Sequence, residues 1–251
     1  LVRDAHHTGV PYGTIDHERL IRALRLVDNE LVLDEGNVQT AESLLLARAL
    51  MNPTVYAHHV ARIAKAMLRQ ASERLLESGT VDAHTLRRMD DYGLRTALRE
   101  CNATQKFARR LDTRQLYKRA AWAELDAVPD SLLTADHNQI QTLERDVAEA
   151  AGVDPTSVII DLPPPPSMAE TTSQVMINGD VRQLEDQSAL VGALRQAQTD
   201  NWRLGIYSPG DDRDRVRDAV VRELGLDRRA TTIPNARSGV NATLDAFADR
   251  T

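Results

Sequence analysis

Apolar residues recur every three or four positions through most of residues 1–112, the spacing that places them on one face of a helix. This pattern predicts the following helices: 16–27, 40–51, 52–77 and three shorter ones between 82 and 110. Asp16 is expected to cap the first of these helices and Asp82 the first of the short ones. Asn52 and Pro53 are expected to begin the third helix, because Asn is a good N-cap and Pro is favoured at the first helical position. Residues 30–34 alternate instead, which predicts a short strand. We therefore expect the first half of the chain to be mainly α-helical.

The pattern changes near Thr113, where short apolar runs begin to alternate with helical segments. The predicted strands cover 116–120, 158–162, 174–177 and 202–207, and the predicted helices cover 138–151, 188–198 and 212–224. Pro163–Pro166 follow the second of these strands as a rigid spacer or a sheet-edge stop. We expect residues 113–225 to form an α+β domain. Residues 226–251 are polar without a sustained period, so we expect a flexible tail.

Composition and charge narrow the class of protein. The formal net charge is -6 at pH 7, whereas a general nucleic-acid binder carries a basic face, so nucleic acid is not an expected partner. No apolar run approaches the roughly 20 residues that span a bilayer, so we expect no membrane segment. Cys101 is the single cysteine, which excludes a disulfide framework and favours a reducing, cytoplasmic compartment. We expect it to be a small core residue.

Asp4, His6 and His7 form the first cluster of side chains with chemical potential. A carboxylate followed by two imidazoles can ligate a metal or hold a sugar hydroxyl. Adjacent histidines on a helix point about 100° apart, however, so they do not readily serve one metal. Capping and packing are the simpler interpretation of this cluster.

Arg48, Asn52 and Tyr56 form the second cluster, at the junction between two predicted helices. Helix N-termini present N–H groups that suit phosphate, and Arg adds a bidentate fork for an anion. Tyr56 lies one turn into the next helix, where it can stack on a ligand or hydrogen-bond to it. The alternative is that Arg48 pairs with Glu42 or another acid and that Tyr56 fills the core. The sequence leaves both interpretations open.

Several common motifs are absent. The sequence has no nucleotide P-loop, Gly-x-Gly-x-x-Gly, Cys-x-x-Cys or Gly-x-Ser-x-Gly, which excludes the commoner kinase, dinucleotide-binding, zinc-ribbon and serine-hydrolase classes. The chain opens within a charged, His-bearing segment and without an initiator Met. We therefore expect it to be the downstream part of a longer protein.

Taken together, the motifs resemble the HD-domain phosphohydrolases, and most closely the SAM-and-HD-domain dNTP triphosphohydrolases. The matching residues are Arg3–Val10, Ile15, Asp16, Arg19, Val27–Leu31, Ala47, Arg48, Tyr56, His58, Val60 and Ile63. The resemblance covers the first 112 residues well and the rest loosely, through Leu116–Lys118. Arg19 matches a residue of the family's nucleotide-controlled allosteric site, but its basic neighbours are not matched, so we do not carry the allostery over.

The resemblance implies roles for three residues and shows a departure at a fourth. An Asp in the position of Asp4 holds the sugar 3′-hydroxyl, an Arg in that of Arg48 holds phosphate oxygens, and a Tyr in that of Tyr56 lines the pocket. Asn52 stands where the triphosphohydrolases carry a pocket His, which favours a broader phosphohydrolase over one specific for triphosphates. The family's divalent metal is held by His, His-Asp and a further Asp, all upstream of this chain. We therefore predict no metal ligand and no catalytic residue within it.

These inferences predict part of a metal-dependent HD phosphohydrolase that cleaves a nucleotide, such as a dNTP, or a related phosphate ester. Residues 1–112 would be the C-terminal part of the helical HD domain. We expect a cytoplasmic homo-oligomer, and we expect the isolated chain to be inactive because it lacks a water-activating centre. Two alternatives stay open: a degenerate, non-catalytic nucleotide-binding or interaction module, and a helical scaffold with no ligand.

Overall fold

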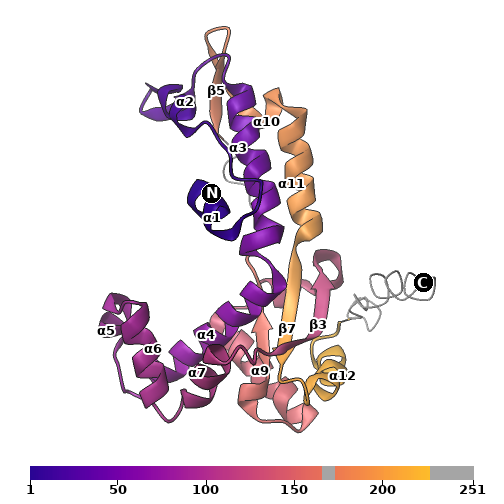
Figure 1. Cartoon of the computed structure of the whole chain (residues 1–251). Coiled ribbons are helices and arrows are strands. Elements are labelled where there is room, and N and C mark those ends of the chain that lie inside the picture. Colours follow the sequence, from indigo (N-terminus) through magenta and orange to yellow (C-terminus); the bar gives the residue numbers. More distant parts are fainter. Residues whose placement is uncertain (166–172, 227–251) are drawn as a thin grey trace, which may run out of the picture. The chain divides into compact units, whose positions relative to one another are not determined.

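The computed structural model describes residues 1–165 and 173–226, and the chain divides into two compact units (Figure 1). The first unit consists of Leu1–Lys118 and Asp161–Arg203, and the second of Arg119–Ile160 with the described part of Leu204–Thr251. The α+β domain predicted over 113–225 thus contributes to both units. The tail predicted over 226–251 lies, beyond Leu226, outside the described residues.

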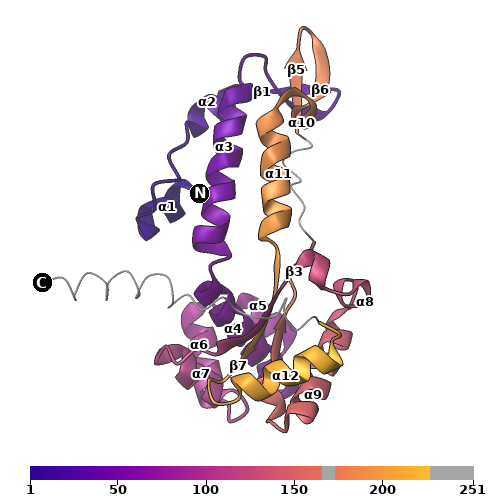
Figure 2. The ribbon, with the colours of Figure 1, turned by 90° about the vertical axis from the view of Figure 1, so that its right-hand side faces the viewer.

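Helices make up most of the first unit. They are α1 (Val2–Thr8), α2 (His17–Arg22), α3 (Val38–Met51), α4 (His59–Glu77), α5 (Ala83–Arg88), α6 (Asp91–Glu100), α7 (Gln105–Asp112), α10 (Leu184–Gln187) and α11 (Ala189–Asn201). In both views α3 and α11 lie side by side (Figure 1, Figure 2). Farther along the chain, α4 packs against α6 and α7. The prediction of a mainly helical first half is confirmed.

The helix predicted over 16–27 is wrong in its second half. Asp16 does cap α2, accepting the N–H of Arg19, but the helix ends at Arg22. Residues Leu24–Val27 instead form β1, which pairs antiparallel with β2 (Glu30–Leu33). Asp28 and Asn29 join the strands with φ angles of 49° and 67°. This pair of left-handed residues is typical of a two-residue hairpin turn, and the turn overrides the helical spacing of the leucines.

The hairpin belongs to a four-stranded sheet that draws on distant parts of the chain. Its order is β1-β2-β5-β6, where β5 (Gln174–Ile177) pairs parallel to β2 and β6 (Asp180–Gln183) pairs antiparallel to β5. The buried residues on this sheet cluster with apolar side chains of α3, α10 and α11: Leu33, Ala41, Leu45, Val175, Leu184, Val191 and Leu194. This cluster explains why residues 161–203 belong to the first unit.

The helix predicted over 52–77 begins later than the sequence indicates. Asn52–Tyr56 form a π-helical turn that continues directly from α3, and the N–H of Ala57 donates to the carbonyl of Asn52. Pro53 lies in the first turn of this segment, where it cannot donate an intrahelical hydrogen bond. The chain then breaks at His58, and α4 runs from His59 to Glu77. The π turn ends at Tyr56, and π segments often mark functional sites.

The second unit is built on a three-stranded sheet of order β3-β7-β4. Its strands are β3 (Lys118–Glu124), β4 (Ile159–Asp161) and β7 (Arg203–Ser208); its helices are α8 (Asp130–Leu133), α9 (His137–Ala151) and α12 (Arg213–Glu223). α9 and α12 pack against each other, and their buried residues are small or β-branched. The predicted α+β character of the second half is confirmed. In the described part of the chain, no helix is long and apolar enough to cross a membrane.

Candidate functional site

α1 carries Asp4 and is held in place by a close turn. The helix ends at Gly9, whose φ of 73° lies in the left-handed region that glycine adopts without strain. The following turn lies so close to α1 that a Cβ on Gly13 would overlap the Cβ of Ala5. Ala5 is the buried residue of α1, whereas the Asp4 side chain keeps 27% of its surface exposed. The packing of this turn therefore fixes the helix while Asp4 stays accessible.

Asp4 and Tyr56 meet across 52 residues of sequence. The Tyr56 hydroxyl donates a hydrogen bond of 2.7 Å to Asp4 Oδ2. Arg3 donates from Nε and Nη2 to Asp4 Oδ1, at 3.0 and 2.9 Å. A carboxylate offers about four acceptor positions, so these three donors leave room for one more. The structure thus joins two residues that the sequence placed in separate clusters.

The contact shifts the proton affinity of both groups. The hydrogen bond from Tyr56, followed by that from Arg3, lowers the pKa of the Asp4 carboxyl. The same hydrogen bond to a carboxylate raises the pKa of the Tyr56 phenol. At neutral pH the pair is therefore an ionised carboxylate and a protonated phenol. An ionised Asp4 can accept a hydrogen bond from a ligand hydroxyl.

Arg48 lies near this pair. It is exposed in the last turn of α3. The Asp4 hydrogen bond is the largest influence on the Tyr56 pKa, and the positive charge of Arg48 opposes it by lowering that pKa. Glu42, the alternative partner of Arg48, accepts a 2.5 Å hydrogen bond from Ser188, the N-cap residue of α11. Tyr56 is partly exposed and bonded to Asp4, so it does not simply fill the core.

Asn52 and Lys65 act on the π turn through the backbone. The carbonyl of Asn52 accepts the N–H of Ala57 at 2.6 Å, next to Tyr56. Lys65 Nζ donates to the carbonyl of Tyr56 at 3.3 Å. Lys65 and the role of Arg3 were not predicted from the sequence. Because Arg3 directly precedes Asp4, the sequence could have indicated an ion pair between them. Nothing in the sequence indicates that Lys65 contacts Tyr56.

The residues of the described ranges do not fit a metal ion. Rings of His6 and His7 lie 5.4 Å apart at 71°, and those of His58 and His59 lie 4.4 Å apart at 40°. In residues 1–165 and 173–226, no group of three or more His, Cys, Asp or Glu side chains is arranged to hold a metal. What these residues offer is a carboxylate, a phenol and an arginine, a set suited to a hydroxyl and an anion.

Cys101 is buried, with 8% of its surface exposed. Hydrogen bonds with the Ser78 and Thr80 hydroxyls lower the pKa of its thiol to about 7. A buried thiol is inert towards bulky reagents. Its burial agrees with the core role predicted for this residue.

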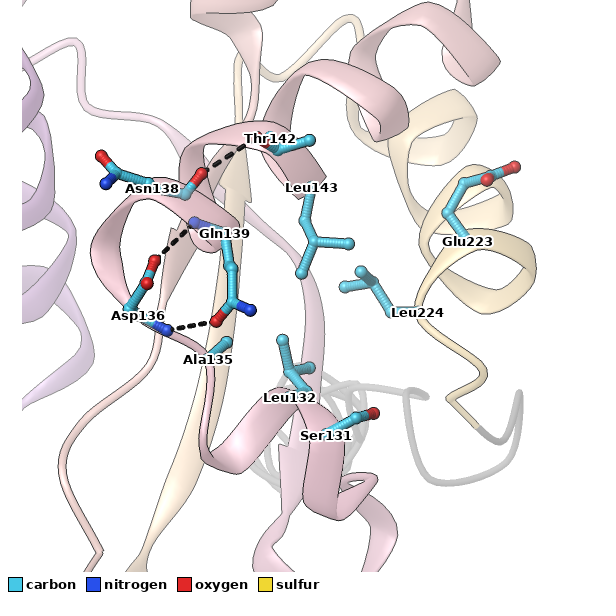
Figure 3. Close-up of a pocket in the computed structure, with 10 residues that line it drawn as sticks. All are labelled: Ser131, Leu132, Ala135, Asp136, Asn138, Gln139, Thr142, Leu143, Glu223 and Leu224. Carbon is cyan, nitrogen blue, oxygen red and sulfur yellow. Dashed lines mark hydrogen bonds between the residues drawn. The ribbon is translucent and has the colours of Figure 1, made fainter.

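The second unit has a cavity of about 460 Å³ between α8, the start of α9 and the end of α12 (Figure 3). Leu132, Leu143 and Leu224 point toward one another at its centre. Its polar groups largely serve the helix: Asp136 accepts the N–H of Gln139 at 2.9 Å, and Gln139 accepts the N–H of Asp136 at 2.7 Å. None of the residues predicted for the site lines this cavity. The Asp4–Tyr56 pair is therefore the stronger candidate.

A family model described as the HD associated region matches residues 15–234. The chain belongs to the HD-associated region family. The resemblance to HD-domain proteins inferred from the motifs is thereby confirmed at the level of an HD-related family.

Two curated relatives of this HD-associated region are described as uncharacterised proteins. An uncharacterised protein of Methanocaldococcus jannaschii is 29% identical over 231 residues, which cover 89% of this chain and 50% of that protein. The uncharacterised protein YwfO of Bacillus subtilis is 36% identical over 87 residues, or 34% of this chain and 20% of that protein. The chain thus spans half the length of the first relative and a fifth of the second.

Solved structures share the fold of the HD-associated region. A hypothetical protein from Aquifex aeolicus has a TM-score of 0.59 at 21% identity, over 87% of this chain and 55% of that one. A phosphohydrolase from Bacteroides thetaiotaomicron has a TM-score of 0.56 at 18% identity, over 82% of this chain and 58% of that one. At these identities the likeness concerns the fold.

Proposed function

We propose that this chain is the substrate-binding part of an HD-family phosphohydrolase that acts on a nucleotide or a related phosphate ester, with dNTPs as the first substrates to test. The observation that carries the proposal is the hydrogen bond between Tyr56 and Asp4, which joins two distant motifs into one polar site. The fold shared with a protein described as a phosphohydrolase supports it.

Each residue has a distinct task in this proposal. Asp4, kept ionised by Tyr56 and Arg3, accepts a hydrogen bond from a sugar hydroxyl. Arg48 pairs with phosphate oxygens, because a guanidinium offers two parallel N–H donors. Tyr56 holds Asp4 in place and lies against the sugar, while Asn52 shapes the turn that carries Tyr56. These groups bind and orient the substrate, and orientation lowers the barrier of a reaction carried out by other groups.

A divalent metal is part of the proposal but not of this chain. When bound, such an ion activates water for attack on phosphorus. In keeping with the resemblance to HD phosphohydrolases, we assign its ligands to a segment upstream of this chain. Homo-oligomeric assembly and a cytoplasmic location belong to the same proposal. The chain on its own should bind nucleotide without turning it over.

The test is metal-dependent phosphate or triphosphate release from a panel of nucleotides, measured on the full-length protein that contains this chain. Asp4→Asn keeps the shape of the side chain and removes its charge. We expect kcat/KM to fall by about 100-fold, since hydrogen bonds to charged groups are among the strongest. Asp16→Asn is the matched control, because Asp16 only caps α2 and Asn is an equally good cap.

The possible outcomes separate the candidate functions. Turnover that falls in Asp4→Asn and stays in Asp16→Asn supports the phosphohydrolase. Nucleotide binding without turnover in the folded, full-length protein favours a non-catalytic nucleotide-binding module. Equal turnover in both variants would contradict the proposed role of Asp4.

A further inference from the structure

A hollow of the first unit lies where α4, α6 and α7 meet, the three helices that pack together in Figure 1. Its volume is about 290 Å³, at the small end of the range for ligand pockets. Its floor is apolar and is formed by Ala64, Leu68, Leu98, Ala108 and Leu111. Leu98 is almost fully buried, whereas Leu68 keeps 36% of its surface exposed. We call this hollow the α4–α6–α7 groove.

Charged side chains form the rim of the groove. Arg95 Nη2 donates to Asp112 Oδ1 at 2.9 Å, and Arg99 donates from Nε and Nη2 to the two oxygens of Asp112 at 2.8 and 2.9 Å. Both arginines keep half or more of their side-chain surface exposed. A guanidinium has five N–H donors, so each arginine has donors beyond those given to Asp112.

The rim carries an excess of positive charge. Two guanidiniums share the single carboxylate of Asp112, and Lys65 adds a third cation. The Lys65 ammonium donates to the neutral carbonyl of Tyr56, and no carboxylate in the described part of the chain pairs with it. Three positive charges against one negative charge leave an excess of two. Asp112 is ionised at any physiological pH, because Arg99 and then Arg95 lower its pKa to about 2, so the excess of two stays constant.

This combination selects for an amphipathic anion. An apolar floor favours a compact aliphatic or aromatic body, and a rim of arginines and lysine favours an anionic end. A phosphate monoester carries between one and two negative charges near pH 7, which matches the excess better than a single carboxylate does. A neutral or cationic ligand would leave the excess positive charge of the rim without a counter-charge.

We propose that the α4–α6–α7 groove binds a phosphate monoester with a compact apolar or aromatic body. The body lies on Leu68, Leu98 and Leu111, and the phosphate lies between Lys65 and the outer N–H groups of the arginines. The groove is separate from the Asp4–Tyr56 pair, and the proposal does not depend on the function proposed above. Lys65 is the one rim residue that also contacts Tyr56, so a bound phosphate competes with the π turn for its ammonium.

The test is calorimetric titration of the full-length protein with phenyl phosphate, in the presence of a chelator so that no metal-dependent turnover occurs. Inorganic phosphate supplies the anion without the body, benzyl alcohol the body without charge, and benzoate the body with a single charge. We expect phenyl phosphate to bind at least about tenfold more tightly than each of the other three probes.

Variants locate the binding site. Lys65→Met removes a rim charge, and Leu68→Asp places a negative charge on the exposed part of the floor. We expect each to weaken phenyl phosphate binding by about tenfold or more. Arg87→Met, on exposed α5 outside the groove, should leave the affinity unchanged and controls for the general loss of positive charge. Because Leu68→Asp leaves Lys65 and Tyr56 in contact, it separates the groove from the Asp4–Tyr56 site.

Arg48→Met distinguishes this proposal from the function proposed above. Affinity that falls in Lys65→Met and Leu68→Asp but persists in Arg48→Met supports the groove. Affinity that falls only in Arg48→Met would place the probe beside Asp4 and overturn the groove proposal. Equal affinity of phenyl phosphate for all variants would also overturn it. So would equally tight binding of phenyl phosphate and inorganic phosphate.

Discussion

Two aspartates of this chain make hydrogen bonds of similar length for different purposes. Asp4 accepts a hydrogen bond of 2.7 Å from the hydroxyl of Tyr56, which lies 52 residues away in the sequence. Asp136 accepts the N–H of Gln139 from three residues away, at 2.9 Å, and beside it lies the cavity of about 460 Å³ in the second unit (Figure 3). The contact of Asp136 completes a capping box at the start of α9. The contact of Asp4 completes no local structure.

The comparison shows why cavity size is a poor guide to the site here. Two of the polar groups beside the second unit's cavity, those of Asp136 and Gln139, are already used to cap the helix that lines it. The carboxylate of Asp4 is held ionised and oriented by the distant Tyr56 and the adjacent Arg3, with an acceptor position left over. A long-range polar contact that stabilises no helix or turn is the better sign of a binding site.

The largest expected difference is between removing a charged group beside Asp4 and removing one beside the cavity of the second unit. Arg48→Met should weaken nucleotide binding by about 100-fold, because the phosphate loses a bidentate, charge-assisted partner. Glu223→Gln, at the rim of the second unit's cavity, should leave the same affinity unchanged. Calorimetric titration of the full-length protein with a nucleotide measures both. A larger loss in Glu223→Gln would reverse the comparison and place the ligand in the second unit.

A smaller effect is expected when the Asp4–Tyr56 hydrogen bond is removed without removing the ring. Tyr56→Phe should weaken nucleotide binding by about tenfold. Asp4 keeps the hydrogen bonds from Arg3 but loses the one from the π turn between α3 and α4 that orients it. Tyr117→Phe is a control for loss of a phenol elsewhere in the first unit. A wild-type affinity in Tyr56→Phe would mean that the hydroxyl contact only stabilises the fold.

The sequence could predict those parts of the fold that local chemistry determines. The caps at Asp16 and Asp82 and the strands around 159–161 and 174–177 follow from residue type and spacing, and the structure has them. β1 was missed, because the apolar residues of 24–27 satisfy helical spacing as well as strand spacing. The π turn at 52–56 was missed because Asn-Pro also begins ordinary helices.

Long-range pairing was beyond local patterns. β2 and β5 pair in parallel across more than 140 residues, as the bond from Gln174 to Glu30 shows, and nothing near either strand encodes the other. Asp4 and Tyr56 were both predicted as site residues, but their hydrogen bond was not. Lys65 was missed altogether, since its role depends on how the π turn presents the Tyr56 carbonyl.

The cap at Asp136 should matter for stability and not for binding. Asp136→Ala removes the acceptor of the Gln139 N–H and should lower the free energy of unfolding by about 1 kcal/mol. Asp136→Asn should cost only a few tenths of that amount, because Asn caps helices well. Chemical denaturation measures the stabilities, and nucleotide titration should show no change. A loss of affinity in Asp136→Ala with stability intact would contradict the assignment of this residue to the helix.

The smallest effect concerns a third aspartate, Asp112, whose hydrogen-bond donors lie farther along the sequence than that of Asp136 and nearer than Tyr56 lies to Asp4. It accepts hydrogen bonds from 13 and 17 residues away, and these tie α6 to α7. Because the folded-state pKa of about 2 lies below the ordinary value near 3.9, its ionised form stabilises the fold above about pH 4. That contribution is lost as the pH falls through about 2.

Asp112→Asn therefore should flatten the stability profile between about pH 4 and pH 2, measured by thermal unfolding at a series of pH values. At neutral pH the same variant leaves both arginines without their carboxylate, so phenyl phosphate should bind more tightly than in the wild-type protein if the α4–α6–α7 groove takes a phosphate monoester. If the acid profile flattens but the affinity for phenyl phosphate is unchanged, Asp112 only stabilises the fold, as Asp136 does. The α4–α6–α7 groove would then not be a binding site of the kind proposed for Asp4.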